Sequence, residues 1–260
     1  MKILTIGDVV GNAGVAYLKQ KLPGLIHASG ADLTVVNGEN AAEIRGIRRE
    51  DAEEIFSAGA DVITTGNHVF GQRNVYSYLD DEKNILRPAN YPGAAAGHGY
   101  VTVNVAGIRV LIMNLRGNVG ITPAVACPFA TADGILKEEK GKFDVAAVDF
   151  HAEATSEKAA LARYLDGRVS LVFGTHTHVA TADEQILPQG TGFITDIGMT
   201  APADSILGCD PSSVIAGFLT AMPQKFSVAV GECRGTGALF DLRPGKDGLY
   251  RTVGVSRITF

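Results

Sequence analysis

The chain has 260 residues, 46% of them hydrophobic, which suffices for a sizeable core and argues against a disordered chain. Its formal net charge of −5 argues against a protein that coats duplex nucleic acid, because no basic excess is present to neutralise phosphates. No apolar run approaches the ~20 residues that span a bilayer, no signal-peptide pattern opens the sequence, and three widely spaced cysteines favour the reducing cytoplasm over a disulfide scaffold.

Apolar runs typical of buried strands alternate with stretches of helical periodicity up to about residue 178. The strand-like runs cover residues 2–6, 33–36, 62–65, 144–148 and 169–173. The helix-like stretches cover residues 14–28, 49–58, 74–81, 130–140 and 157–165. Pro23 and Gly24 predict a break or bend in the first helix, and Ser156 is the expected cap of the last.

Hairpins and shorter strands complete the pattern. The segments on either side of Ala106-Gly107 alternate between apolar and polar residues, which predicts a β-hairpin of residues 100–105 and 108–114. Beyond residue 178 we expect one helix around residues 212–220 and mostly antiparallel strands at residues 185–187, 192–195, 226–231, 238–242 and 251–259. This order predicts an α/β fold in which two mixed β-sheets pack face to face with flanking helices. No repeat or linker interrupts it, so residues 1–260 are predicted to form a single domain.

Side chains that bind metal ions follow five of the predicted strands. The five segments are Gly7-Asp8, Asn37-Gly38-Glu39-Asn40, Gly66-Asn67-His68, Asp149-Phe150-His151 and Gly174-Thr175-His176-Thr177-His178. His176 and His178 are two residues apart, so both rings can point to the same side of an extended backbone. Imidazoles together with carboxylate and amide oxygens suit Zn, Fe or Mn. The sequence therefore predicts a metal site at these strand ends.

The residues themselves suggest different roles within that site. A carboxylate such as Glu39 has two oxygens and is able to bridge two cations. The amide oxygen of Asn67 is a candidate ligand, whereas His68, one residue on, points elsewhere and is a candidate acid or base. Taken alone, Asp8 is equally a helix cap, and Asn37-Gly38 a tight turn. For the other two histidines we expect surface or packing roles; they are His27 and His98.

Other chemistries fit the motifs poorly. A dinucleotide-binding loop after the first strand needs glycine where Val9 stands, and the Gly-Lys-Ser/Thr of a phosphate-binding loop is missing. Serine and cysteine residues lack a nucleophile elbow, which argues against covalent catalysis. A glycosidase would not need histidines and asparagines at several strand ends.

The combined motifs resemble those of calcineurin-like metallophosphoesterases, and most closely their YmdB-type bacterial branch of cyclic-nucleotide phosphodiesterases. The resemblance extends from the first strand into the last third of the chain and includes residues 149–158, 174–179 and 195–199. The chain departs from the general superfamily at Val10, where a histidine is usual, at Asn37-Gly-Glu-Asn40, and at Val69, where an acid is common. These departures match the YmdB-type branch and give no support to protein phosphatase activity.

The resemblance implies a metallophosphoesterase-like four-layer sandwich with two metal ions per chain. Fe or Mn is expected, and Zn is also compatible with the ligands. Asp8, Asn40 and His178 would bind one ion, the other would be bound by Asn67, His151 and His176, and Glu39 would bridge them. A metal-bridging hydroxide would attack phosphorus in line, and His68 would protonate the leaving alkoxide. Arg116 and Arg45 are candidates to approach the substrate.

The implied function is hydrolysis of cyclic nucleotides, with 2′,3′-cyclic substrates first and 3′,5′-cyclic substrates as a further option. The expected partner is therefore a small phosphodiester, with no duplex nucleic acid and no membrane, and a homo-oligomer is left open. The alternative is a regulatory nucleotide- or metal-sensing protein with little turnover on the same scaffold. The sequence leaves open the native metal, the physiological substrate and the cellular role.

Overall fold

Two mixed β-sheets form the centre of the protein, which is described over residues 1–260 by a computed structural model. The eight-stranded sheet has the order β2-β12-β13-β1-β3-β4-β5, with β14 paired to β13. Strands β1, β3, β4 and β5 run parallel, and β13 runs antiparallel to β1. The strands of this sheet are β1 (Lys2–Ile6), β2 (Asp8–Val9), β3 (Leu33–Asn37), β4 (Val62–Thr64), β5 (Ile85–Leu86), β12 (Met199–Pro202), β13 (Cys233–Pro244) and β14 (Tyr250–Thr259).

The second sheet has six strands in the order β10-β11-β9-β8-β7-β6. Strands β7, β8, β9 and β11 are parallel, while β6 and β10 run antiparallel at the two edges. Its strands are β6 (Tyr100–Val105), β7 (Ile108–Arg116), β8 (Val145–His151), β9 (Leu171–Thr175), β10 (Gln185–Ile186) and β11 (Gly192–Ile194).

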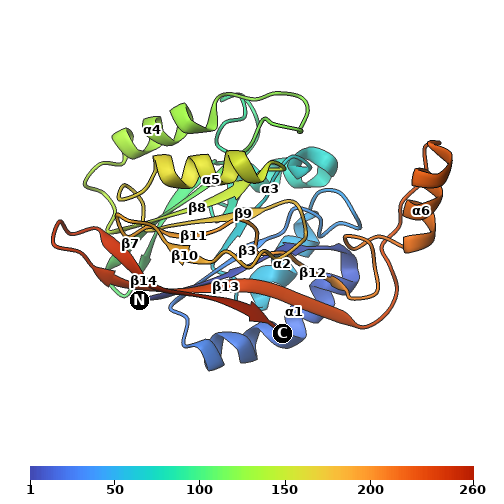
Figure 1. Ribbon diagram of the computed structural model, residues 1–260, viewed down its shortest axis with the longest axis horizontal. Helices are drawn as coiled ribbons and strands as arrows, with labels where there is room; N and C mark the ends of the chain where they lie inside the picture. The colour runs from blue at the N-terminus through green and yellow to red at the C-terminus, as the bar shows by residue number, and fades with distance from the viewer.

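Helices cover the outer faces of both sheets, which gives four layers (Figure 1). Helices α4 (Pro128–Glu138) and α5 (Thr155–Tyr164) pack on the six-stranded sheet. The other sheet is covered by α1 (Gly11–Ser29), α2 (Arg49–Ser57) and α3 (Tyr76–Asp81), the last following the short 3-10 helices η1 (Val69–Gly71) and η2 (Arg73–Val75).

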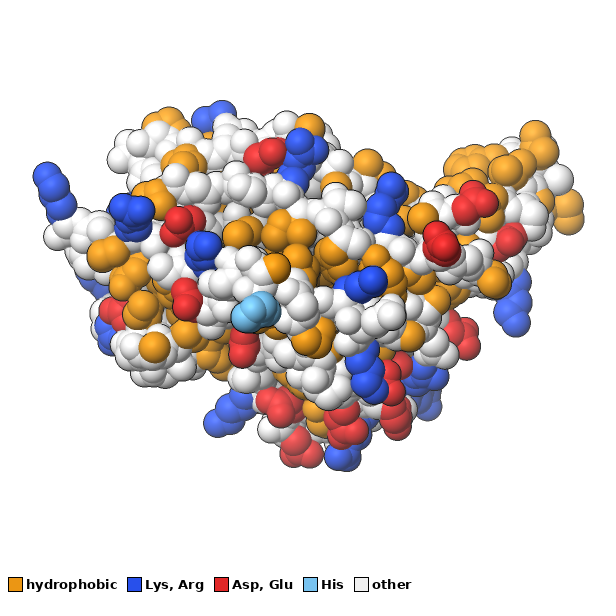
Figure 2. Space-filling model, turned by 90° about the horizontal axis from the view of Figure 1, so that it is seen from below, with side chains coloured by type: hydrophobic (Ala, Val, Ile, Leu, Met, Phe, Trp, Pro, Cys, Tyr) orange, Lys and Arg blue, Asp and Glu red, His pale blue; other side chains and the backbone are white.

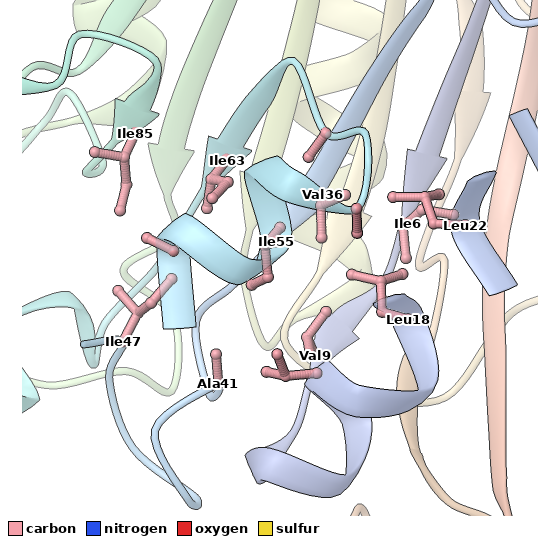
Figure 3. Packing of buried hydrophobic residues seen from close by; sticks show 14 of the residues in the cluster. Ile6, Val9, Leu18, Leu22, Val36, Ala41, Ile47, Ile55, Ile63 and Ile85 are labelled. Carbon is pink, nitrogen blue, oxygen red and sulfur yellow. The ribbon is translucent and has the colours of Figure 1, made fainter. Parts of the chain in front are cut away.

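Three hydrophobic clusters correspond to the three interfaces between these layers. Successive residues of β1 point to opposite faces, so Ile3 lies between the two sheets whereas Leu4 packs beneath α1 and α2. Figure 3 shows the cluster beneath these helices, in which Leu18 of α1 lies near Ile6 of β1 and Ile55 of α2 lies near Ile63 of β4. The third cluster joins α4 and α5 to the six-stranded sheet. Burial on both faces explains why the central strands are continuous apolar runs.

The fold class expected from the sequence is confirmed, and so are the hairpin and most helix positions. Two local predictions were wrong. Helix α1 continues as one element past Pro23, which lies on its exposed side, so the helix is not broken there. Helix α5 begins at Thr155 and has no side-chain cap, so Ser156 lies inside the helix instead of capping it.

The last third of the chain differs most from expectation. The segment 226–231 forms a single bridge at Val228 and no strand, whereas β12 was not predicted. Strand β11 pairs parallel to β9, although this part of the chain was expected to be mostly antiparallel. Helix α6 (Pro211–Thr220) stands away from the body of the protein and buries none of its residues (Figure 1). Figure 2 shows apolar side chains gathered at that end. None of the helices has the length and hydropathy needed to cross a bilayer.

Candidate metal centre

Five parallel strands bring the proposed ligands to one edge of the two packed sheets. Three glycines permit the close approach, because a side chain at any of them would collide with a neighbour. A Cβ on Gly7 would lie 2.2 Å from the Gly198 carbonyl oxygen, and one on Gly66 would lie 2.2 Å from the His151 ring. A Cβ on Gly174 would lie 1.8 Å from the Thr195 carbonyl oxygen. The glycines of the sequence motifs are therefore requirements of packing.

Three of the predicted ligands meet around His151. Its Nε2 lies 3.1 Å from Asn67 Oδ1 and 3.0 Å from His176 Nδ1. Ligand atoms about 2.1 Å from one cation lie roughly 3.0–3.4 Å apart in octahedral or tetrahedral geometry. The separations between these three donors are therefore those of atoms that share a metal ion.

A second group lies around His178. Its Nε2 is 3.1 Å from Asn40 Nδ2 and 3.6 Å from Asp8 Oδ1. Asp8 Oδ1 is fully buried and has no hydrogen-bond partner, although its other oxygen accepts the backbone N–H of His176. An unpartnered buried carboxylate oxygen is costly, and a cation would satisfy it. The unpartnered oxygen of Asp8 therefore indicates that this group of side chains is suited to bind a metal ion.

Glu39 lies between the two groups and is almost completely buried. Its Oε1 is 3.6 Å from His151 Nε2 and 3.6 Å from His68 Nδ1, and its carboxylate accepts the backbone N–H groups of Gly66 and His68. Asp8 Oδ1 also lies 3.9 Å from His151 Nδ1, which connects the groups a second time. All seven residues predicted as ligands are thus in one cluster.

Hydrogen bonds at the far side of His151 and His178, and a carboxylate contact at the far side of His176, determine which nitrogen of each ring faces the cluster. The Thr175 hydroxyl donates to Asp149 Oδ1 at 2.7 Å, so it accepts from His151 Nδ1 at 3.0 Å. The Nδ1–H of His178 donates to the Leu207 carbonyl at 2.9 Å. His176 Nε2 lies 3.1 Å from the Glu153 carboxylate. Each ring therefore presents an unprotonated nitrogen to the cluster, as ligation requires.

Burial and charge set the titration of these groups. Burial raises the pKa of Asp8, but the neighbouring His178 outweighs it and holds this pKa below its usual range. Burial, with the nearby charge of Asp8, raises the pKa of Glu39 well above its ordinary value despite the N–H bonds from His68. Burial lowers the pKa values of His151 and His176. A bound cation would favour the carboxylate form of Glu39 and suits neutral imidazoles.

His68 lies at the edge of the cluster with about a third of its side chain exposed. It lines a cleft of about 280 Å³ together with Asn40, Glu153, His176, His178 and residues of apolar character. Burial, followed by the charge of Arg45, lowers the pKa of His68 to about 4. Its Nδ1 is 3.2 Å from Asn40 Oδ1. His68 therefore contacts a predicted ligand while its ring faces the cleft, as expected of an acid or base.

Three details of the sequence-based site need correction. His176 and His178 lie on left-handed backbone, with φ values of 99° and 64°, and not on the extended backbone expected, and their rings contact different partners, His151 and Asp8. Arg116 is fully buried, and its guanidinium donates to the carbonyls of Ile121 and Pro123 and so does not reach the cleft. Asn40 presents its Nδ2 to His178, so ligation needs its amide to rotate by half a turn.

The residues behind the ligands were missed by the sequence interpretation. The sequence could have indicated Asp149 and Thr175. Asp149 lies two residues before His151 on the same strand face, and Thr175 pairs with His151 between β8 and β9. Glu153 lies in a loop and gives no such signal. His27 and His98 are exposed and lie away from the cluster, in agreement with the surface roles expected for them.

The carboxylate and imidazole groups of the cluster do not by themselves form a complete set of metal ligands. No three His, Cys, Asp or Glu side chains are arranged so that they would hold a metal ion by themselves. The separations of 3.6 Å and more around Asp8 and Glu39 account for this. Bound cations would draw these carboxylates inward, and the amide oxygens of Asn40 and Asn67 would each contribute to one of the two ligand sets.

Comparison with known proteins gives one consistent answer. A family model described as YmdB-like protein matches residues 4–252. A 2′,3′-cyclic-nucleotide 2′-phosphodiesterase of Bacillus subtilis (strain 168) is 42% identical over 258 residues, which are 99% of this chain and 96% of that protein. A crystal structure of a hypothetical protein from Thermus thermophilus has a TM-score of 0.92 at 39% identity, covering 100% of this chain and 99% of that one. A Mycoplasma pneumoniae protein described as a novel phosphatase has a TM-score of 0.91 at 31% identity, covering 100% and 93%. The family resemblance of the strand-end motifs is thereby confirmed, and the chain belongs to the YmdB-like protein family.

Proposed function

We propose that the chain hydrolyses 2′,3′-cyclic nucleotides at a dinuclear metal centre and opens the ring at the 2′ oxygen. Phosphoric-diester hydrolysis is the reaction class of the 42% identical Bacillus subtilis relative. The observation that carries the proposal is the convergence of seven donor residues from five strand ends beside the partly exposed His68. Hydrolysis of 3′,5′-cyclic nucleotides is the extension that a substrate panel would test.

Two sets of residues would hold the metals. His151, His176 and Asn67 form one set, and the second consists of Asp8, Asn40 and His178, with Glu39 between the sets. When bound, the two cations supply positive charge for the phosphoryl oxygens and an activated water. Mixed nitrogen and oxygen donors favour Fe or Mn and accept Zn.

No lysine or arginine lines the cleft, although Arg45 lies close enough to His68 for its charge to lower the pKa of that ring. The cleft lining contains Glu153, which adds negative charge, and the buried guanidinium of Arg116 is turned away. Charge stabilisation of the substrate would therefore depend on the metals, whereas the protein orients the ligands and excludes water behind them. Val10, Ile44 and Leu207 give the cleft an apolar side against which a nucleoside would lie.

His68 would provide the proton for the leaving 2′ oxygen. The pKa of about 4 keeps its ring neutral at neutral pH, so the single N–H proton given to the leaving oxygen would have to be replaced from cleft water for the ring to return to its neutral form. If Asn40 turns its oxygen toward the metal, its Nδ2 donates to His68 Nδ1, and the proton of the ring moves to Nε2 on the cleft side. In this way, metal ligation by Asn40 would determine which nitrogen of His68 carries the proton.

A substrate panel tests the proposed function. Metal-loaded protein is offered 2′,3′-cyclic AMP, 3′,5′-cyclic AMP, a linear dinucleotide and adenosine monophosphates, and the products are separated by chromatography. The proposal expects 2′,3′-cyclic AMP to be turned over best and to give the 3′-monophosphate. Turnover of monophosphates alone, or the 2′-monophosphate as the main product, would contradict it. An intact candidate donor beside the cluster favours turnover over a purely sensing role.

We also propose that residues 1–260 act as one domain. The three free cysteines support a place in the cytoplasm, where thiols stay reduced.

A further inference from the structure

Two residues of the recognised motifs have no role in the proposed reaction, although both are fully buried beside the ligands. Lys158 lies in α5, and Asp196 follows β11. The Lys158 Nζ atom is 2.6 Å from Asp196 Oδ2. Gly174 leaves room for this approach, because a Cβ there would lie 2.9 Å from Lys158 Cδ. The sequence thus provides a glycine, a lysine and an aspartate for one buried ion pair.

The Asp196 carboxylate also holds the loop that carries two of the proposed ligands. Asp196 Oδ2 accepts the backbone N–H of Thr177 at 3.1 Å and its hydroxyl at 2.8 Å. Its Oδ1 accepts the N–H of Gly198 at 2.9 Å, and the Gly198 carbonyl in turn accepts the N–H of Asp8 at 3.1 Å. One carboxylate therefore fixes the residue between His176 and His178 and the backbone that leads to Asp8.

The histidine loop needs such support. Non-glycine residues with positive φ are strained, and they persist only where the surrounding structure determines them. Here His176 and His178 are both of this kind, with Thr177 between them. A buried ion pair is a poor source of net stability, because desolvation of both charges offsets their attraction. Here the ion pair instead fixes the orientation of the Asp196 carboxylate, which accepts the hydrogen bonds from Thr177.

We infer that the Lys158–Asp196 pair is a positioning device that holds Thr177, and through it aims His176 and His178 at the metals. The inference rests on the proposed metal centre. Loss of second-sphere support typically weakens metal affinity by about 10–100-fold. The device acts on both metals, because the two histidines belong to different ligand sets.

The first test compares Lys158→Met and Thr177→Val with Asp183→Asn as a matched control. Asp183 accepts hydrogen bonds from Thr181 and Thr195 in the same region but does not contact Thr177. Thr177→Val removes one hydroxyl and leaves the ion pair in place, so it is expected to fold even if Lys158→Met does not. Mn²⁺ affinity, measured by calorimetry on the folded variants, is expected to fall about 10–100-fold in Lys158→Met and less in Thr177→Val. It should be unchanged in Asp183→Asn. Equal losses in all three, or wild-type affinity in both test variants, would overturn the inference.

The second test is made on metal-free protein. Hydrogen exchange should show the Thr177 amide protected in the wild type and in Asp183→Asn, and exchanging at least about 10-fold faster in Lys158→Met and in Asp196→Asn. The Ile197 amide, which donates to the Gly174 carbonyl, serves as the internal reference. Equal protection of the Thr177 amide in all variants that fold would show that the pair does not hold the loop. Because no metal or substrate is present, this result stands even if the proposed reaction is wrong.

Discussion

The Nε2 atom of His151 lies 3.0 Å from the Nδ1 atom of His176; the Thr175 hydroxyl at His151 Nδ1 leaves Nε2 of His151 unprotonated, and the Glu153 carboxylate 3.1 Å from His176 Nε2 favours the same for Nδ1 of His176. Two unprotonated nitrogens at this distance repel unless a proton or a cation lies between them. The pKa values of both histidines are lowered by burial, which disfavours the proton. This contact is therefore the strongest single indication of a metal site.

Replacement of Glu39 is expected to affect both metals. In Glu39→Gln, which keeps the shape of the side chain, the charge between the two groups is lost, and metal content should fall from about two ions per chain to one or fewer. His178→Ala should remove chiefly the ion held with Asp8 and Asn40. Elemental analysis of protein purified without chelator checks both variants. Two retained metals in Glu39→Gln would exclude the bridging role.

Acidification is expected to release the two metals in order. Imidazole ligands must be neutral to bind, so a proton displaces the metal from a histidine with a raised pKa at higher pH than from one with a lowered pKa. Although burial opposes the charged form, Asp8 raises the pKa of His178, whereas burial lowers the pKa values of His151 and His176. As pH falls, the ion at His178 should therefore leave first. Metal content after equilibration at decreasing pH measures this, and simultaneous loss or the reverse order would contradict it.

His68→Ala tests the proton donor. The variant should keep both metals and its substrate affinity, but kcat for 2′,3′-cyclic AMP should fall by roughly 10²–10⁴. The loss should be smaller for a nitrophenyl diester, because nitrophenolate departs without a proton. Similar losses for both substrates would argue against the donor role. Loss of one metal in the variant would make His68 a ligand and require the second site to be reassigned.

Thr175→Val tests the hydrogen bonds behind the ligands. The substitution removes the hydroxyl that accepts from His151 and donates to Asp149, whose pKa burial already raises to about 7. Metal affinity should fall about 10–100-fold. The control is Thr5→Val. Thr5 lies in β1 and is equally buried, and its hydroxyl donates to the Ala238 carbonyl and contacts none of the proposed ligands. Equal effects of the two substitutions would mean that general destabilisation is the cause.

The sequence indicated the candidate ligands because they follow apolar runs, and the ends of parallel strands meet at one edge. It could not give the direction of each side chain there. His176 and His178 were placed on extended backbone, whereas the contacts of Thr177 with Asp196 hold both in left-handed conformations. Arg116 was a candidate to approach the substrate, yet its guanidinium is buried among carbonyl groups. Such contacts join segments distant in the chain, which local patterns do not record.

The same limit applies to the fold. Residues 2–6 and 33–36 are apolar throughout because both faces of β1 and β3 are covered, so they were predicted as strands. Strand β12 has only four residues and pairs with β2 and β13, which lie far away in the sequence. Its short run contains no periodicity that would separate it from a loop. Pro23 predicted a break or bend on local grounds, yet α1 continues through this exposed residue as one element.

The dinuclear claim is tested most directly by titrating metal-free protein with Mn²⁺ while the hydrolysis of 2′,3′-cyclic AMP is followed in the same samples. Activity is expected to be absent without metal, to rise as about two equivalents bind, and to stay flat after that. Metal-free protein with full activity, or full activity with only one ion bound per chain, would contradict a dinuclear phosphodiesterase centre.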